Sequence, residues 1–131
     1  MTTPFWCILI AGLLPYVWSG VAVKARVDQF GQLDNRLPRL QQAQLQGFGA
    51  RALGASANAF ETFPLFAAAV IVAHIAGAEP GWSATWSVVY VASRILHGIC
   101  YASDLDKARS AAFGLGQACS IALFVLAARA A

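Results

Sequence analysis

Four apolar stretches separated by short polar segments dominate the chain. They lie at about residues 4–23, 51–76, 82–101 and 108–128. Each is long enough to cross a bilayer as a helix, for which about 20 residues suffice. The pattern predicts an all-α fold, an integral membrane four-helix bundle in which residues 1–131 form a single four-span domain.

The longest polar segment, residues 24–50, determines the expected topology. From residue 24 to residue 51 the basic residues are Lys24, Arg26, Arg36, Arg39 and Arg51, against the acidic Asp28 and Asp34. Basic loops stay on the cytoplasmic side, so we expect this loop in the cytoplasm and both termini outside. Asp34 and Asn35 have turn chemistry. Pro38 is expected to begin a helix that continues without a break into the second span.

Composition supports a membrane protein. The chain is 59% hydrophobic and 11% charged, with a mean hydropathy of +0.61, whereas soluble domains are about 45–50% apolar and about 25% charged. The net charge of +3 comes from basic residues beside apolar segments, so nothing suggests a nucleic-acid surface. Cys7, Cys100 and Cys119 have no metal-ligand spacing, and we expect buried, unpaired thiols. A catalytic cysteine is a minor alternative.

Polar residues inside the apolar stretches are the candidate chemistry. In the second stretch, Arg51, Asn58 and Glu61 fall on one helical face, with the small residues Gly54 and Ala57 beside them. An ionised group near hydrocarbon costs several kcal/mol unless it is paired or wetted, so such a face indicates a functional site. The alternative is a structural Arg–Glu pair that holds helices together.

The third stretch adds a second polar face, with Arg94, His97 and Tyr101 at i, i+3 and i+7. Four spans would place both faces and the start of the fourth stretch at the cytoplasmic boundary. The residues collected there are Arg26, Arg51, Asn58, Glu61, Arg94, His97, Tyr101, Arg109 and Ser110. Four arginines and a glutamate suit a ligand with more than one carboxylate and an amine, while apolar walls suit a lipophilic reactant. Each arginine alone is better explained as a topological or headgroup contact, and it is the convergence of three helices on one level that favours a site.

Three motifs in this order resemble the MAPEG superfamily, the membrane-associated proteins of eicosanoid and glutathione metabolism. They are N-x-x-E-x-F-P-L-F from Asn58, R-x-x-H-x-x-x-Y from Arg94, and R-S at Arg109. The segment D-N-R-L-P-R, residues 34–39, resembles bacterial members, and the resemblance covers essentially the whole chain. It implies a homotrimer of four-helix subunits in the bacterial inner membrane, with glutathione bound as cosubstrate at subunit interfaces near the cytoplasmic face.

The resemblance also implies residue roles. Asn58 and Glu61 would hold the peptide and the γ-glutamyl amine of glutathione, and Arg109 would stabilise its thiolate beside Ser110, so these last two are the expected catalytic residues. Further glutathione-binding positions implied by the family are Arg26, Arg51, Arg94, His97 and Tyr101.

Four positions depart from the family pattern. Gly54 and Ala57 replace arginines, Ser56 replaces His or Gln, and Phe113 replaces a tyrosine found in members with well-defined glutathione sites. The expected carboxylate clamp is therefore thinner, and a different thiol is an equally consistent ligand.

Three functions are compared. The first is a membrane-bound glutathione-dependent transferase or peroxidase acting on lipophilic electrophiles or lipid hydroperoxides. The second is a non-catalytic lipid- or glutathione-binding membrane protein on the same scaffold. The third is a small proton-coupled transporter using Glu61, which is disfavoured because such transporters place their acid in the first span and residues 4–23 contain none.

Overall fold

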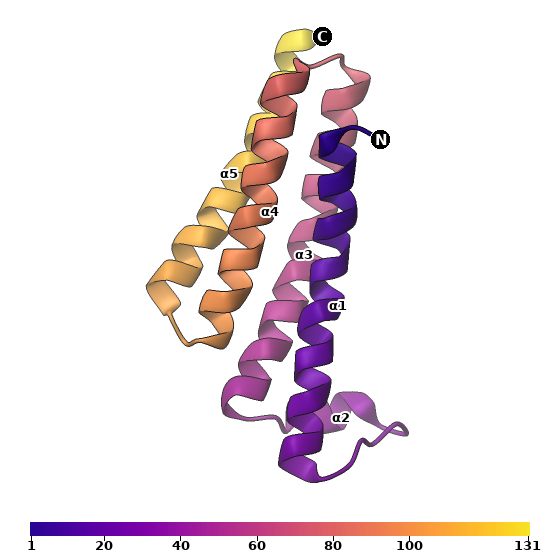
Figure 1. The fold of residues 1–131 in the computed structure, drawn as a ribbon, viewed down its shortest axis with the longest axis vertical. Helices are drawn as coiled ribbons and strands as arrows, with labels where there is room; N and C mark the ends of the chain where they lie inside the picture. The colour runs from indigo at the N-terminus through magenta and orange to yellow at the C-terminus, as the bar shows by residue number, and fades with distance from the viewer.

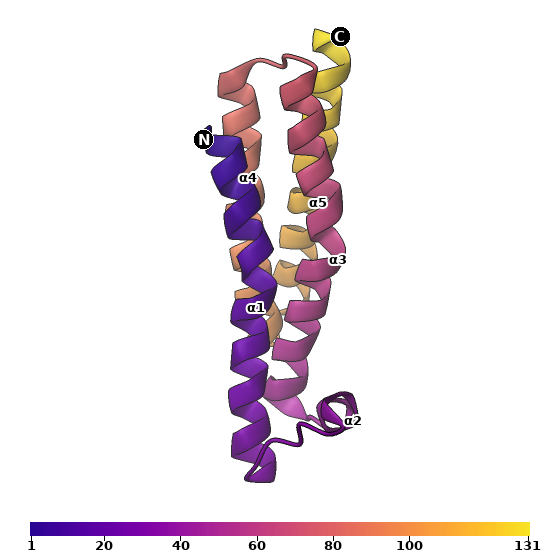
Figure 2. The same cartoon turned by 90° about the vertical axis from the view of Figure 1, so that its right-hand side faces the viewer.

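The computed structural model describes all residues, Met1–Ala131, and its regular structure is all helical, which confirms the expected all-α fold. Four long helices run alongside one another: α1 (Thr3–Phe30), α3 (Gly47–Ile75), α4 (Pro80–Ala102) and α5 (Asp106–Ala130) (Figure 1). The short α2 (Pro38–Ala43) lies at one end of the bundle, and both termini lie at the opposite end (Figure 2). The side of the membrane on which each end lies stays a prediction.

Three of the long helices, α1, α3 and α5, are long and apolar enough to cross a membrane. Helix α4 has 23 residues but carries several buried polar side chains. These are Ser83, Ser87, Ser93, Arg94 and His97. Because they face the other helices, the polarity of α4 is directed into the bundle, and a crossing by α4 stays a prediction.

Helix α1 continues past the expected end of its apolar stretch to Phe30. It stops at Gly31, whose φ of 77° is the left-handed conformation that glycine adopts readily, and the Gly31 N–H donates to the carbonyl of Val27 at 2.9 Å. An exposed pair between Lys24 and Asp28 at 2.6 Å spans one turn of the extension. Asp34 Oδ1 then accepts the N–H groups of Arg36 and Leu37, which confirms the turn expected at Asp34.

The expectation of one continuous helix from Pro38 into the second span is wrong. Helix α2 ends at Ala43 and α3 begins at Gly47, which has φ of 54°. The side chain of Gln29 satisfies both sides of the break: its Nε2 donates to the carbonyl of Gln44 at 3.1 Å, and its Oε1 accepts the N–H of Gln46 at 3.1 Å. A helix can stop here because a neighbouring helix supplies the missing hydrogen bonds.

The packed core occupies the half of the bundle nearest the termini. Phe66 of α3 and Tyr90 of α4 stack with ring centroids 3.7 Å apart, and the Tyr90 hydroxyl donates to the carbonyl of Thr62 at 3.2 Å. Leu123 and Cys119 of α5 belong to the same cluster of buried residues, and their side chains have no exposed surface. All three cysteines are free and buried, as expected.

Glu79 caps α4 in the turn that joins it to α3. Its carboxylate accepts the backbone N–H groups of Trp82 at 2.6 Å and Gly81 at 2.8 Å. These hydrogen bonds, that of Trp82 foremost, hold the pKa of Glu79 below its ordinary value of 4.5. The cap satisfies two of the N–H groups that a helix leaves unpaired at its start.

We predict that Glu79→Ala lowers the melting temperature at neutral pH, because two N–H groups lose their acceptor. Since the folded pKa is the lower one, the stabilisation is complete above about pH 4.5 and is lost as the pH falls through the folded pKa. Circular dichroism melts in detergent of the wild type and Glu79→Ala should therefore converge in acid. A difference in melting temperature that does not depend on pH would contradict this role.

Candidate functional site

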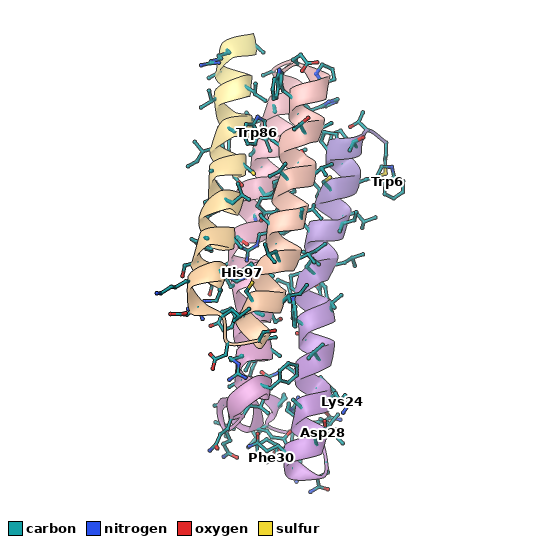
Figure 3. The ribbon with its side chains drawn as sticks, turned by 60° about the vertical axis from the view of Figure 1, so that its left-hand side comes forward. Trp6, Lys24, Asp28, Phe30, Trp86 and His97 are labelled. Atoms are coloured by element: carbon teal, nitrogen blue, oxygen red, sulfur yellow. The ribbon has the colours of Figure 1, made fainter.

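A polar cavity of about 290 Å³ lies between α3, α4 and α5, in the half of the bundle away from the termini. Figure 3 shows His97 low on α4, near the turn into α5. The lining residues are Asn58, His97, Tyr101, Arg109, Ser110 and Phe113. The first five are candidates expected from the sequence, so the structure brings together residues from all three motifs.

The short turn between α4 and α5 places the end of one helix beside the start of the next. Arg51 of α3 stabilises this turn: its Nε donates to the carbonyl of Ala102 at 3.1 Å, and its Nη1 lies 3.6 Å from Asp104 Oδ2. Asp104 has φ of 63°, a conformation that non-glycine residues seldom adopt. Arg51 therefore stabilises the turn beside the cavity and is not one of the residues that line it.

Arg94 is the buried cation behind the cavity, with only 4% of its surface exposed. Its Nη2 donates to Asn58 Oδ1 at 2.5 Å and lies 3.2 Å from His97 Nδ1. Its Cζ is 5.8 Å from the centroid of the Phe113 ring, within the range of a cation–π contact. No carboxylate of the chain pairs with it, and Nε and Nη1 have no acceptor. Arg94 does not itself line the cavity, so its unpaired positive charge lies directly behind the lining residues Asn58, His97 and Phe113, where it favours an anion in the cavity.

Tyr101 and Arg109 form the second part of the cavity wall. The Arg109 Cζ lies 4.5 Å from the centroid of the Tyr101 ring, and His97 meets the same ring edge-on at 5.7 Å. Ser110 Oγ donates to the carbonyl of Asp106 at 3.0 Å. Arg109 has no ion pair in the chain, so its charge is free to act on a ligand.

Gly54 of α3 leaves the space that the Tyr101 side chain occupies in this wall. A Cβ at position 54 would lie 2.6 Å from the Tyr101 hydroxyl oxygen. Only glycine leaves room for the ring as it stands, so this departure from the family pattern has a local structural reason. The Ser56 hydroxyl, another departure, donates to the carbonyl of Pro15 at 2.8 Å and lies 3.0 Å from Ser19 Oγ, so it joins α3 to α1.

Two expected site residues lie elsewhere. Arg26 is buried, and its Nε and Nη2 donate to Gln41 Oε1 at 2.8 and 2.6 Å, with a further bond from Nη2 to the carbonyl of Asp34 at 3.2 Å. It thus ties the loop before α2 to α1. Glu61 is exposed near the middle of α3, has no ion pair or hydrogen bond within the chain, and does not line the cavity.

Phe113 lines the cavity although it is not one of the expected ligand residues, since the resemblance indicates its position only as a departure from a family tyrosine. It contacts Arg94 as described, and its ring centroid is 6.2 Å from that of His97. The signal was present in its spacing, because Phe113 lies one helical turn after Arg109 and Ser110 and hence on their face of α5. An apolar ring beside two cationic or polar groups gives the cavity one lipophilic wall.

Apolar helices of membrane-spanning length around a cavity lined by arginine, histidine and amide side chains define an all-α membrane protein with a polar site between its helices. A family model described as MAPEG family matches residues 3–129. The chain therefore belongs to the MAPEG family, membrane proteins of glutathione and eicosanoid metabolism, which confirms the resemblance. No curated protein matches the chain.

We predict that Asn58→Leu lowers the free energy of unfolding by about 1–3 kcal/mol, because a buried guanidinium loses an acceptor. Asn58→Asp should be at least as stable as the wild type at neutral pH, since the carboxylate gives Arg94 the counter-charge that it lacks. Denaturant unfolding in detergent, followed by circular dichroism, measures both effects. Asn35→Leu in the exposed loop is the control. A fully stable Asn58→Leu would show that Arg94 does not depend on Asn58.

Proposed function

We propose that the protein is a membrane-bound glutathione-dependent transferase or peroxidase that acts on lipophilic electrophiles or lipid hydroperoxides. One observation carries the proposal: the buried Arg94 guanidinium behind the cavity has two donors without an acceptor and no carboxylate partner in the chain. Glutathione is an anionic thiol peptide. Its carboxylates are attracted by an unpaired guanidinium, whose N–H groups donate charge-assisted hydrogen bonds to carboxylate oxygens.

The other cavity residues fit the remaining groups of such a ligand. Asn58, Tyr101 and Ser110 offer amide and hydroxyl groups for a peptide backbone. Arg109 lies in the first turns of α5, where its charge adds to the positive end of the helix dipole. A sulfur atom placed there would be held as thiolate.

The proposed reaction depends on keeping this sulfur ionised. A free thiol has a pKa of about 8.5 and is only a small fraction thiolate at neutral pH, and a neighbouring cation raises that fraction. In the transferase reaction the thiolate bonds to an electrophilic carbon and displaces its leaving group. In the peroxidase reaction two thiols reduce a hydroperoxide to an alcohol and water and are oxidised to a disulfide. Phe113 supplies an apolar wall for the lipophilic reactant.

We further propose a homotrimer, in which Glu61 faces a neighbouring subunit and receives the ligand ammonium there. An exposed carboxylate in the middle of a membrane-spanning helix is costly against lipid, so a protein or water environment is required. The number three comes from the family resemblance. Native mass spectrometry in mild detergent should show trimers, and a spectrum of monomers or dimers alone would contradict the proposal.

The test of the function is glutathione conjugation to chlorodinitrobenzene and reduction of cumene hydroperoxide by the purified protein in detergent. Retention on a glutathione matrix without either reaction would favour the non-catalytic binding protein instead. Failure of both binding and turnover would overturn the proposal.

We predict different effects for the two charged residues. Arg109→Ala should move the titration midpoint of the bound thiol, followed by thiolate absorbance, up by at least about one pH unit, equivalent to about 1.4 kcal/mol. It should lower kcat more than it weakens binding, and Arg109→Lys should retain part of the activity because its charge survives.

Glu61→Gln should mainly weaken glutathione binding, since the ammonium is held equally in ground and transition states.

The matched control for Arg109→Ala is Arg129→Ala, which removes an arginine from the far end of the same helix. It should leave the thiol titration and kcat unchanged. A titration that is unaffected by Arg109→Ala would show that this arginine has a structural or headgroup role.

A further inference from the structure

A second cavity, of about 410 Å³, lies at the end of the bundle that holds the termini. It is formed by the start of α1, the end of α3 and the start of α4, with one residue from α5. Phe5, Val70, Ala84 and Leu123 give it apolar walls. Its volume falls within the range of about 300–1,000 Å³ found for small-molecule sites. We call it the outer cavity, and it shares no residue with the polar cavity.

Ser83 is the polar side chain in its wall that has no partner. The residue is 8% exposed, and its Oγ makes no hydrogen bond. Other hydroxyls of α4 behave differently: Thr85, Ser87 and Ser93 donate to the carbonyls of Gly81, Ser83 and Tyr90 at 2.9, 2.7 and 2.6 Å. Buried hydroxyl groups are normally hydrogen-bonded, so the unused group of Ser83 indicates a missing partner.

The rest of the outer cavity indicates an uncharged partner. No Lys, Arg, Asp or Glu side chain lines it, and His74, whose ring meets that of Phe5 edge-on at 4.9 Å, is its one titratable side chain. The one further charged group among the lining residues is the α-amino group of Met1, a residue that is 78% exposed. The nearby carboxylate of Glu79 already accepts two N–H groups at the start of α4. A charged group buried beside Ser83 would have no charged side chain of the lining to pair with, and its burial would be costly.

We propose that the outer cavity binds an uncharged long-chain alcohol or carbonyl compound. Its single oxygen hydrogen-bonds to Ser83 Oγ, and its chain lies against Phe5, Val70 and Leu123. This binding site does not depend on the proposed glutathione chemistry, because the two cavities lie in opposite halves of the bundle.

The experiment uses a long-chain alcohol that carries a photoreactive diazirine, with the intact protein in detergent. Labelled peptides are located by mass spectrometry, and labelling is competed with unlabelled dodecanol. We expect saturable labelling within residues 1–5, 70–74 and 78–84, the segments that line the outer cavity. A diazirine-bearing alkane of the same length, which has no oxygen, should label these segments with lower apparent affinity.

Two variants and two matched controls test the assignment. Ser83→Ala should weaken the apparent affinity by about two- to tenfold, the effect of losing one neutral hydrogen bond. Ala84→Leu should abolish saturable labelling, because the larger side chain fills the space. Thr85→Ala, which also removes a hydroxyl, and Ala92→Leu, which makes the same enlargement, lie on exposed positions of α4 outside the cavity and should label like the wild type.

Labelling that does not saturate, or that spreads over all four long helices, would overturn the proposal, as it would show only partitioning of the probe into detergent. An affinity unchanged in both Ser83→Ala and Ala84→Leu would also overturn it. Circular dichroism of each variant separates loss of the site from loss of the fold, and Ser83→Ala tests the proposal alone if Ala84→Leu does not fold.

Discussion

The buried charge of the Arg94 guanidinium is the constraint that the half of the bundle away from the termini must satisfy. A buried cation without a counter-charge is costly in a membrane protein unless polar groups surround it. Three helices meet this requirement together: α3 supplies the amide of Asn58, α4 the imidazole of His97, and α5 the ring of Phe113. Gly116 of α5 allows the approach, because a Cβ there would lie 3.2 Å from Arg94 Cδ. The three residues that surround this side chain, Asn58, His97 and Phe113, also line the polar cavity.

The half of the bundle nearest the termini holds the packed core, which fixes the positions of the helices that surround Arg94. Helices in lipid associate through close packing and interhelical hydrogen bonds, since burial from lipid gains little. Phe66 and Tyr90 stack, and the Tyr90 hydroxyl reaches the carbonyl of Thr62, which lies one turn beyond Asn58 on α3. Because Tyr90 also precedes Arg94 by one turn on α4, the same two helices are held in register immediately beside the site. Packing in one half therefore fixes the geometry of the other.

Helical periodicity predicts which site residues share a face of one helix, but it does not predict which groups on other elements they contact. Arg94, His97 and Tyr101 share a face because their spacing determines it, and the structure confirms that they lie together. Arg26 and Arg51 have the same chemistry as Arg94, yet Arg51 hydrogen-bonds to the carbonyl of Ala102 on α4, and Arg26 to the side chain of Gln41 in α2 and the carbonyl of Asp34 in the preceding loop. The break before α3 cannot be read from the local pattern for the same reason, since the residue whose side chain hydrogen-bonds to both sides of it, Gln29, lies in α1. Hydropathy predicts which segments are helical, but it contains no information on these partners.

The departures from the family pattern now limit what the polar cavity can bind. The Tyr101 hydroxyl stands where a side chain at position 54 would begin, so an arginine there would require the ring to move. Within one subunit, the cations left at or directly behind the cavity are Arg94 and Arg109. Under the proposed function, Arg109 is occupied with the thiolate, which leaves Arg94 for one carboxylate. A second carboxylate of the same ligand would find no further cation among the residues that line the cavity, so under the proposed function that group would meet solvent or the proposed neighbouring subunit. Under the proposed function, the cavity would therefore favour a thiol with one well-placed carboxylate, and any preference for glutathione over a smaller thiol acid would have to come from contacts outside this chain.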